Sequence, residues 1–236
     1  MDEQIVVKNG LHIVLDIDGT LMDNGLSSDN HDGISCSRFL YFRPGLINFL
    51  DYCLKHCASV SIWTAGNEEW MSGFIKALPC RFREAFLFTW HIKRCNVKYQ
   101  RTGLMTTKLV ILKRLNKVWS KKWTKKIGMT RNNTIIIEDT PSNCLNNYGN
   151  AVYVSEYNRF KLKAQEDDTL PKLQLYLDHL SAHQTVRNIE KRNWMFQLKI
   201  QEEEDKTKRE KEKEKAKQDD QTAQTVIYEG EGKGEC

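Results

Sequence analysis

Two aspartates, Asp16 and Asp18, directly follow a short apolar run, Ile13-Val14-Leu15, and precede a turn at Gly19. Such a run is typical of a strand buried in a sheet. Side chains two residues apart in an extended segment share a face, so both carboxylates would lie at the carboxyl end of the strand, where open α/β sheets bind ligands. Paired carboxylates need a cation or a shared proton. The pair predicts a site of that kind, although a functionless acidic turn would have the same sequence.

Two later strands are predicted to end in polar residues as well. One apolar strand ends at Thr64-Ala65-Gly66, and Thr134-Ile135-Ile136-Ile137 ends at two adjacent acids, Glu138 and Asp139, before a proline. Strands separated by helices form parallel sheets with right-handed crossovers. We therefore expect the polar ends of the three strands to meet at one edge of the sheet.

Apolar periodicity and breakers predict an alternation of strands and helices. We expect strands at 12–16, 59–63, 86–89, 134–137 and 151–154, and helices at 45–56, 67–78, 106–119 and 141–148. The fold class is therefore α/β, a three-layer Rossmann-like parallel sheet flanked by helices. Residues 24–37 are rich in Gly, Ser, Asn and Asp and are expected to form a loop too short for a large cap domain, so we expect an open pocket.

The ordered set of strand-end acids, Thr, Lys and a second acid pair resembles the haloacid dehalogenase superfamily of phosphohydrolases. The closer resemblance is to its protein-phosphatase branch, the RNA polymerase II C-terminal-domain phosphatases and their NLI-interacting-factor-like relatives. It rests on residues 10 to 160 and on these branch markers: Tyr41-Phe42-Arg43-Pro44-Gly45, Trp63-Thr64-Ala65, and Phe88-Thr89-Trp90 followed by Cys95.

The resemblance implies roles for the site residues. Asp16 would be the nucleophile that forms an aspartyl phosphate, and Asp18 the general acid and base. Thr64 and Ala65 would bind the phosphoryl group together with a lysine. The lysine of relatives lies in a Lys-x-Leu element, which Lys113-Arg114-Leu115 fits. Lys108, in the same predicted helix, is the alternative.

The resemblance also implies a Mg²⁺ ion, because several carboxylates would otherwise repel a phosphate. The expected protein ligands are Asp16, Asp18 through its backbone carbonyl, Glu138 and Asp139. Relatives usually have Asp followed by Asp or Asn at the last motif, whereas this chain has Glu followed by Asp. Glu138 is the positional match, and Asp139 could replace or support it.

The function implied is a Mg²⁺-dependent phosphomonoester hydrolase, a protein serine/threonine phosphatase that acts on a phosphorylated protein or peptide. One alternative is a phosphatase for a small phosphate ester or a nucleic-acid end, which the same acids could serve. Another is a non-catalytic scaffold of the same fold. A scaffold has no physical need for clustered, mutually repelling acids, so we favour an enzyme.

Charge and composition divide the 236-residue chain, whose net charge is +5. Residues 1–185 hold nearly all the core-forming side chains and are the predicted catalytic domain. Residues 186–236 are predicted to be a charged tail, helical to disordered. The basic segment 113–131, which contains Trp119 and Trp123, could be the exposed face of an amphipathic helix or could bind an acidic phosphopeptide. Nucleic acid remains an alternative partner.

Seven cysteines at irregular spacing, no secretory leader and no apolar stretch of membrane-spanning length favour an intracellular protein, cytoplasmic or nuclear, with free thiols. Cys53 and Cys57 lie one helical turn apart with His56 between them. No second Cys/His pair accompanies them, so we interpret both as buried small side chains rather than as metal ligands.

Overall fold

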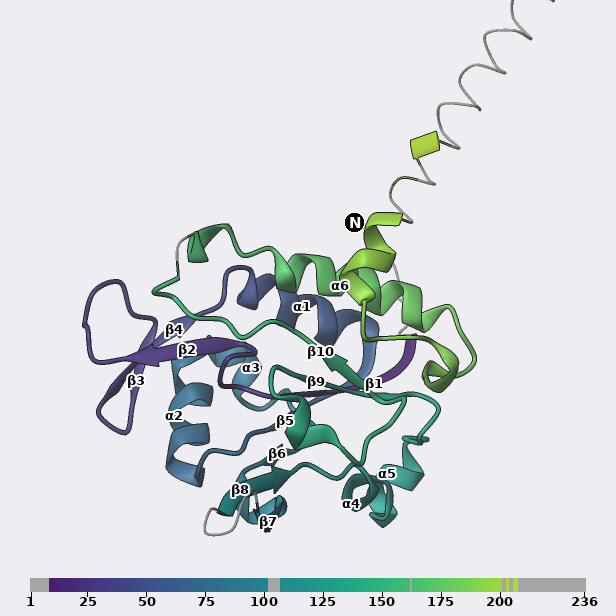
Figure 1. Cartoon of the computed structure of the whole chain (residues 1–236), viewed down its shortest axis with the longest axis horizontal. Coiled ribbons are helices and arrows are strands. Elements are labelled where there is room, and N and C mark those ends of the chain that lie inside the picture. The colour runs from purple at the N-terminus through teal and green to yellow at the C-terminus, as the bar shows by residue number, and fades with distance from the viewer. Residues whose placement is uncertain (1–8, 102–106, 162, 201–202, 204–205, 208–236) are drawn as a thin grey trace, which may run out of the picture. The chain divides into compact units, whose positions relative to one another are not determined.

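A computed structural model describes residues 9–101, 107–161, 163–200, 203 and 206–207 of the chain (Figure 1). The chain divides into two compact units, Met1–Trp194 and Met195–Cys236. All the sheets and the site residues belong to the first unit. The predicted disordered end of the tail lies outside the described residues, and the boundary at residue 185 stays a prediction.

The centre of the first unit is a parallel sheet of five strands in the order β10-β9-β1-β5-β6. Leu15 lies opposite both Ile62 and Ile137, so the three central strands end at the same level. The strands are β1 (Asn9–Leu15), β5 (Cys57–Trp63), β6 (Thr89–Trp90), β9 (Thr134–Glu138) and β10 (Ala151–Tyr153).

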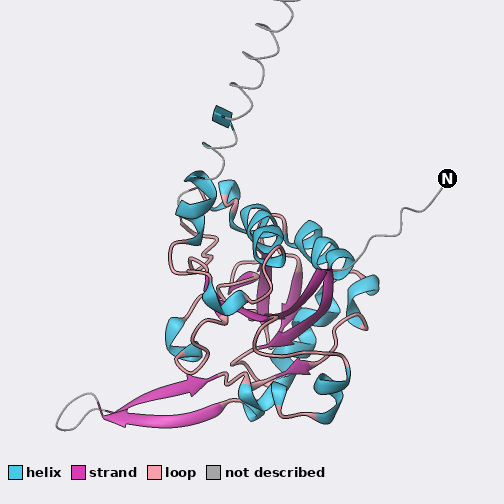
Figure 2. Ribbon diagram, turned by 90° about the vertical axis from the view of Figure 1, so that its right-hand side faces the viewer, coloured by secondary structure: helices cyan, strands magenta, loops and turns pink. Residues whose placement is uncertain are grey.

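Helices cover both faces of this sheet. Helices α1 (Leu46–His56) and α6 (Thr169–Ser181) lie on one face, and α4 (Asn116–Trp119) and α5 (Lys122–Lys126) on the other (Figures 1 and 2). Consecutive β1 residues are completely buried because each face is covered, as parallel strands require. On the α4 face, Val14, Ile136 and Trp63 form a core with Leu115 and Val118. The predicted three-layer α/β fold is confirmed.

The prediction of a loop at 24–37 is wrong in part. This segment contributes to a small antiparallel sheet in the order β2-β4-β3. Its strands are β2 (Met22–Gly25), β3 (Gly33–Ser35) and β4 (Arg38–Phe42). Cys36 and Ser37 join β3 to β4 with φ angles of 48° and 58°, the positive values that a two-residue hairpin turn requires. Three short strands are no large cap, as predicted.

The predicted helix at 106–119 is also wrong. Residues Thr107–Leu112 form strand β8, which pairs antiparallel with β7 (Asn96–Arg101), and only Asn116–Trp119 are helical. The β-branched residues Thr107, Val110 and Ile111 favour a strand once a partner strand is present. The predicted helix at 141–148 shrinks to a 3₁₀ turn, η2 (Pro141–Cys144).

The remaining helical segments agree better with the sequence. Helix α1 falls within the range 45–56 predicted for it, and α2 (Glu68–Ala77) begins after an N-cap at Asn67. The other short helices are α3 (Cys80–Arg83), η1 (Ile92–Arg94), η3 (Ala164–Glu166) and η4 (Val186–Asn188). In the described part of the chain, no helix is long and apolar enough to cross a membrane.

Arg43 of the aromatic-Arg-Pro-Gly element is buried and shapes the loop after β1. Its Nε and Nη2 atoms donate to the two carboxylate oxygens of Asp167, both at 2.9 Å. Its Nη1 atom donates to the carbonyls of Gly19 at 3.4 Å and Thr20 at 3.1 Å. Arg43 of this element therefore has a structural role, because its hydrogen bonds fix the backbone next to Asp18.

The six cysteines in the described residues are unpaired, as predicted. Cys53 and Cys57 are buried, which agrees with their interpretation as small core side chains. In and next to the basic segment, Leu112, Leu115 and Val118 are buried, but short separate elements rather than one amphipathic helix carry them.

Candidate active site

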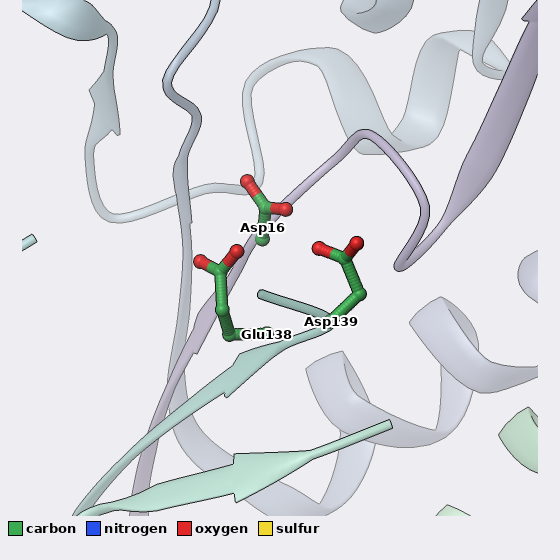
Figure 3. Close-up of side chains that lie close together, drawn as sticks. All are labelled: Asp16, Glu138 and Asp139. Carbon is green, nitrogen blue, oxygen red and sulfur yellow. The ribbon is translucent and has the colours of Figure 1, made fainter. Parts of the chain in front are cut away.

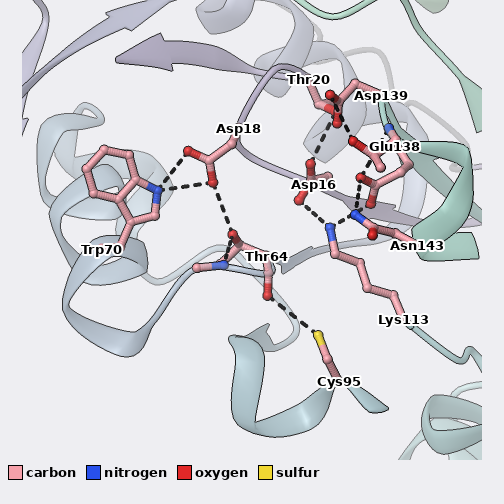
Figure 4. A network of polar contacts seen from close by, with 12 residues as sticks. Asp16, Asp18, Thr20, Thr64, Trp70, Cys95, Lys113, Glu138, Asp139 and Asn143 are labelled. Atoms are coloured by element: carbon pink, nitrogen blue, oxygen red, sulfur yellow. Dashed lines mark hydrogen bonds and ion pairs between the residues drawn. The ribbon is translucent and has the colours of Figure 1, made fainter. Parts of the chain in front are cut away.

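Asp16, Thr64 and Glu138 lie at the carboxyl edge of three adjacent strands. Asp16 follows β1, Thr64 follows β5, and Glu138 ends β9. Because β1 lies between the other two in the sheet, the ends of all three strands face one site (Figure 4). Asp16, Thr64 and Glu138 are all at most 3% exposed, so their polar groups must be satisfied inside the protein.

Lys113 links two of the three strand ends. Its Nζ atom donates to Asp16 Oδ1 and, at 2.6 Å, to Glu138 Oε2 (Figure 4). The lysine directly follows β8, and its backbone is held by hydrogen bonds with Asn143 and Asn147 at 2.8 and 2.6 Å. Lys108, the alternative candidate, is exposed in the hairpin strand β8. The structure therefore brings Lys113 to the acids and leaves Lys108 in solvent.

Lys113 is completely buried and yet remains charged. Burial alone lowers the pKa of its ammonium group, but the carboxylates of Asp16 and Glu138 outweigh burial and hold this pKa above its ordinary value. A fixed positive charge therefore stands beside the Asp16 carboxylate, where it can neutralise a phosphoryl oxygen.

Three carboxylates converge next to this lysine. Asp16, Glu138 and Asp139 each offer one oxygen that lies within 4.8 Å of the other two (Figure 3). Burial, and secondly the charge of Asp16, raises the pKa of Glu138 and of Asp139. Within the described residues, Lys113 is the only cation in an ion pair with the cluster. An all-oxygen donor set with excess negative charge fits Mg²⁺.

Gly19 permits the close approach of Asp139 to the turn after Asp18. The φ angle of Gly19 is 72°, and a Cβ atom there would lie 2.5 Å from Asp139 Oδ2. A larger residue would therefore strain the turn and displace a member of the carboxylate cluster. Both the positive φ angle and the lack of space for a Cβ atom therefore explain why this position is a glycine.

The carboxylate of Asp18 points away from the other three. It accepts hydrogen bonds from Trp70 Nε1 at 2.9 and 3.1 Å, and from Thr64 Oγ1 at 3.3 Å (Figure 4). Burial, and secondly the charge of Asp16, raises the pKa of Asp18 to about 6. A carboxyl group near that value can both give and take a proton close to neutral pH.

Thr64 presents its hydroxyl to Asp18 while its neighbours fix its position. Its Oγ1 atom accepts from the backbone N–H of Gly66 at 2.9 Å. Its carbonyl lies 3.9 Å from the buried thiol of Cys95. Ala65, the next residue, is half-buried at the same turn.

An open pocket of about 340 Å³ lies on the Asp18 side of this edge. It is bordered by the small sheet on one side and by the start of α2 on the other. Its lining residues are Asp18, Asn24, Cys36, Arg38, Gly66, Asn67 and Trp70. The general-acid candidate is therefore reachable from solvent, while Asp16 lies deeper.

The sequence analysis missed Trp70, Asn143 and Asn147. Trp70 is nearly buried, and its backbone N–H donates to the N-cap Asn67 at 2.7 Å. That N-cap was a readable signal for the start of the helix and so for the position of the indole. Asn143 donates to Glu138 Oε1 at 3.0 Å, and no motif in the sequence indicates this bond.

A comparison with models of known protein families identifies the family of this chain. The model of the NLI interacting factor-like phosphatases matches residues 11–187. The chain belongs to this family. It is thereby placed in the haloacid dehalogenase branch that includes the C-terminal-domain phosphatases, which confirms the resemblance in the sequence.

Curated relatives of this family member are distant. Ubiquitin-like domain-containing CTD phosphatase 1 of Xenopus laevis is 24% identical over 185 residues, which cover 77% of this chain and 53% of the relative. The chain thus spans about half the length of that relative. An uncharacterized FCP1 homology domain-containing protein of Schizosaccharomyces pombe is 26% identical over 200 residues, covering 80% of this chain and 77% of the relative.

Solved structures of similar proteins include Fcp1, an essential RNA polymerase II CTD phosphatase, with a TM-score of 0.47 and 14% identity. The match covers 73% of this chain and 62% of Fcp1. An uncharacterized protein from Listeria monocytogenes matches with a TM-score of 0.44 and 12% identity, over 73% of this chain and 99% of that protein.

Proposed function

We propose that this family member is a Mg²⁺-dependent phosphomonoester hydrolase that removes phosphate from serine or threonine side chains of proteins through an aspartyl phosphate on Asp16. The observation that carries the proposal is the position of Lys113, buried between Asp16 and Glu138 within a cluster of three carboxylates. A lysine that serves the fold alone would pair with one acid, whereas this one leaves an excess of negative charge for a cation and a phosphoryl group to balance.

Asp16 is the nucleophile in this proposal. Lys113 holds one of its oxygens, and Thr20 Oγ1 lies 3.4 Å from the other. A carboxylate oxygen of Asp16 attacks phosphorus, and the bond from phosphorus to the substrate oxygen breaks. Lys113, the hydroxyl of Thr64 and the backbone N–H of Ala65 stabilise the charge on the phosphoryl oxygens.

Asp18 moves the protons. Its protonated carboxyl group gives a proton to the departing serine or threonine oxygen, and its carboxylate later takes one from the water that hydrolyses the aspartyl phosphate. The raised pKa of about 6 suits both steps. The indole of Trp70 and the hydroxyl of Thr64 orient this carboxyl group.

The carboxylates of Asp16, Glu138 and Asp139, with the backbone carbonyl of Asp18, would hold the Mg²⁺ ion. The ion would neutralise phosphoryl charge and fix the phosphate in line with Asp16. Glu138 already shares its oxygens between Lys113 and Asn143, so Asp139 is the more available ligand of the two.

A phosphorylated protein segment is the proposed substrate, because the pocket beside Asp18 is open and only a small sheet borders it. The relatives named as CTD phosphatases support a protein substrate. Residues 1–185 would carry this activity in the cytoplasm or nucleus, with the tail as an appendage.

Parallel assays test the proposal. Phosphoserine and phosphothreonine peptides, free phosphate esters and end-phosphorylated oligonucleotides are incubated with the purified chain and Mg²⁺. We expect the peptides to have the highest kcat/KM, chelation to abolish turnover, and Ca²⁺ not to restore it. A higher kcat/KM for a free ester or an oligonucleotide end would show that the substrate is of that class and not a phosphorylated protein. No turnover on any probe would favour the scaffold alternative.

A further inference from the structure

Positive charge is concentrated in one segment far beyond what the active site uses. Residues 85–137 contain thirteen lysines and arginines and not a single aspartate or glutamate. The net charge of the whole chain is only +5, so the remainder is acidic on balance. Of these thirteen cations, Lys113 belongs to the site already described. The others require a separate explanation.

Three of these cations, Lys98, Arg101 and Lys108, lie on the β7–β8 hairpin, which extends away from the central sheet as a two-stranded ribbon (Figure 2). Cross-strand partners share a face, so the pairs Val97–Ile111 and Tyr99–Leu109 form an apolar face. Val97 is 47% exposed, Tyr99 78% and Leu109 46%. Ile111, nearest the body of the domain, packs against the core, whereas Val97, Tyr99 and Leu109 leave the outer part of the face exposed.

The opposite face and the outer end of the ribbon are basic. Lys98 pairs with Val110, and Lys108 pairs with Gln100, so both lysines lie on the face opposite to Tyr99. Arg101, the last residue of β7, is exposed as well and lies at the outer end of the ribbon, on the face of Tyr99. The ribbon is thus amphipathic, with one apolar face and cations around it.

Such a ribbon is poorly suited to stand alone in water. A two-stranded hairpin is marginally stable by itself, and each strand here has an outer edge with backbone groups that a further strand can pair with. Edge pairing combined with pockets for alternate side chains is a recurrent mode of peptide binding. The hairpin therefore has the geometry of a strand-addition site.

We propose that the β7–β8 hairpin binds an extended acidic segment of a partner protein, with apolar side chains at alternate positions. The alternating apolar side chains would lie against Tyr99 and Leu109, while the acidic ones would face the cations Lys98 and Lys108 on the opposite face. A second copy of this chain is disfavoured because its hairpin carries the same positive charge. Nucleic acid is disfavoured because Tyr99 is the single aromatic side chain among the described residues of this face, whereas single strands stack successive bases on several rings.

The hairpin that would bind the partner segment is directly connected to the active site. Strand β8 ends at Leu112, and the next residue is Lys113 of the site. A segment bound along β8 is therefore held by the same stretch of backbone that positions the buried lysine. The inference goes beyond the phosphatase chemistry, because binding to the hairpin requires no turnover.

Direct binding measurements on the full chain test the inference. The probes are a fluorescent peptide that alternates glutamate and valine, a peptide that alternates lysine and valine, and a fluorescent single-stranded oligonucleotide. Anisotropy is recorded over a series of salt concentrations. We expect only the acidic peptide to bind, and its affinity to fall as salt rises, because salt screens exposed charges.

Two double variants separate the apolar from the electrostatic contribution. Tyr99→Thr with Leu109→Thr keeps strand-forming residues, and we expect the affinity for the acidic peptide to fall by about tenfold or more. Lys98→Glu with Lys108→Glu leaves the apolar face intact, and we expect a similar loss together with a weaker salt dependence. Turnover of an aryl phosphate should be unchanged in the threonine variant.

The matched control is Lys122→Glu with Lys125→Glu in α5, which makes the same change in charge at exposed positions off the hairpin. We expect it to change the affinity by less than about twofold. Equal binding by wild type and the hairpin variants would overturn the proposal. So would preferential oligonucleotide binding that the Lys98→Glu, Lys108→Glu variant abolishes, or dimerisation in sedimentation experiments that the threonine variant abolishes.

Discussion

Among the residues that the structure describes, Arg43 and Lys113 each belong to a buried cluster of charge, and the two clusters are balanced in opposite ways. Arg43 faces a single carboxylate, Asp167, through two parallel hydrogen bonds of 2.9 Å, and it also donates to backbone carbonyls and to side-chain hydroxyls, among them Thr169 Oγ1 at 2.8 Å. Lys113 faces two carboxylates and lies next to a third, Asp139. The side chains of Arg43 and Lys113 are both fully buried.

The difference separates a structural pair from a candidate catalytic one. A buried ion pair stabilises a fold when its charges match and its hydrogen bonds are complete, as they are around Arg43. The cluster at Lys113 has an excess of negative charge, and burial together with the charge of Asp16 raises the pKa of Asp139. Such a cluster costs stability unless a ligand balances it, so substitutions in the two places should separate activity from stability.

Asp16→Asn should have the largest effect. It keeps the shape of the side chain but removes the nucleophile, so turnover of a phosphopeptide or an aryl phosphate should be abolished. The unfolding free energy should stay the same or rise, because one of the repelling charges is lost. Turnover and urea unfolding measure the two quantities. Appreciable turnover by this variant would refute Asp16 as the nucleophile.

Lys113→Ala should lower turnover by about a hundredfold or more, because a group that stabilises phosphoryl charge is removed, a contribution of roughly 3 kcal/mol. It should also lower the unfolding free energy, since the two carboxylates lose their cation. Lys108→Ala is the matched control, and its exposed side chain should contribute little to either quantity. The reverse pattern would make Lys108 the phosphate ligand.

Arg43→Met should show the opposite balance, a large loss of stability. The Asp167 carboxylate would be left without its cation, at a cost of about 3 kcal/mol in the unfolding free energy. Activity should fall only as far as the loop at Gly19 and Thr20 moves. Urea unfolding, with turnover measured well below the midpoint, distinguishes the two effects.

The pH dependence of the unfolding free energy tests whether Arg43 and Asp167 interact as an ion pair. Burial raises the pKa of Asp167, but the hydrogen bonds and charge of Arg43 hold it below its ordinary value of 3.8. The stabilisation is therefore complete above that ordinary value and is lost as pH falls through the lowered one. Wild type should thus lose more stability in acid than Asp167→Asn. Equal losses would show that Arg43 stabilises Asp167 by packing alone.

The site was more predictable from the sequence than the hairpin, for a physical reason. Asp16, Thr64 and Glu138 each follow an apolar run, and parallel strands bring their carboxyl ends to one edge whatever the connections between them. The short apolar segment 109–112 is compatible with a helix or a strand in isolation. Its antiparallel pairing with 96–101 makes it a strand, and local periodicity does not contain that information.

The hydrogen bond between Trp70 and Asp18 could not be predicted from the sequence either. Trp70 is far from Asp18 along the chain, and a tryptophan on a helix most often indicates core packing. Only the assembled fold brings its Nε1–H to the carboxylate. The lysine was identified because a short spacing motif places it, even though the helix predicted around it is a strand and a loop. The motif thus led to a residue that lies beside the acids even though the element predicted around it was wrong.

Trp70→Phe should have the smallest effect and the most specific one. The variant keeps an aromatic ring against Gly66 but loses the N–H that holds Asp18, so the general acid is less well oriented. A poor leaving group such as the oxygen of serine needs this acid, whereas a nitrophenolate departs without a proton. We expect kcat for a phosphoserine peptide to fall by about tenfold, with KM unchanged and nitrophenyl phosphate turnover nearly normal.

Trp119→Phe is the matched control, because that indole donates at 3.1 Å to Thr134 at the opposite end of β9. Its loss should affect both substrates equally through stability alone. If Trp70→Phe also lowered turnover of the two substrates by the same factor, the indole would support the pocket as a whole. A loss confined to the phosphoserine peptide would tie the indole to the proton that Asp18 delivers, and so to the part of the site that stands apart from the Lys113 cluster.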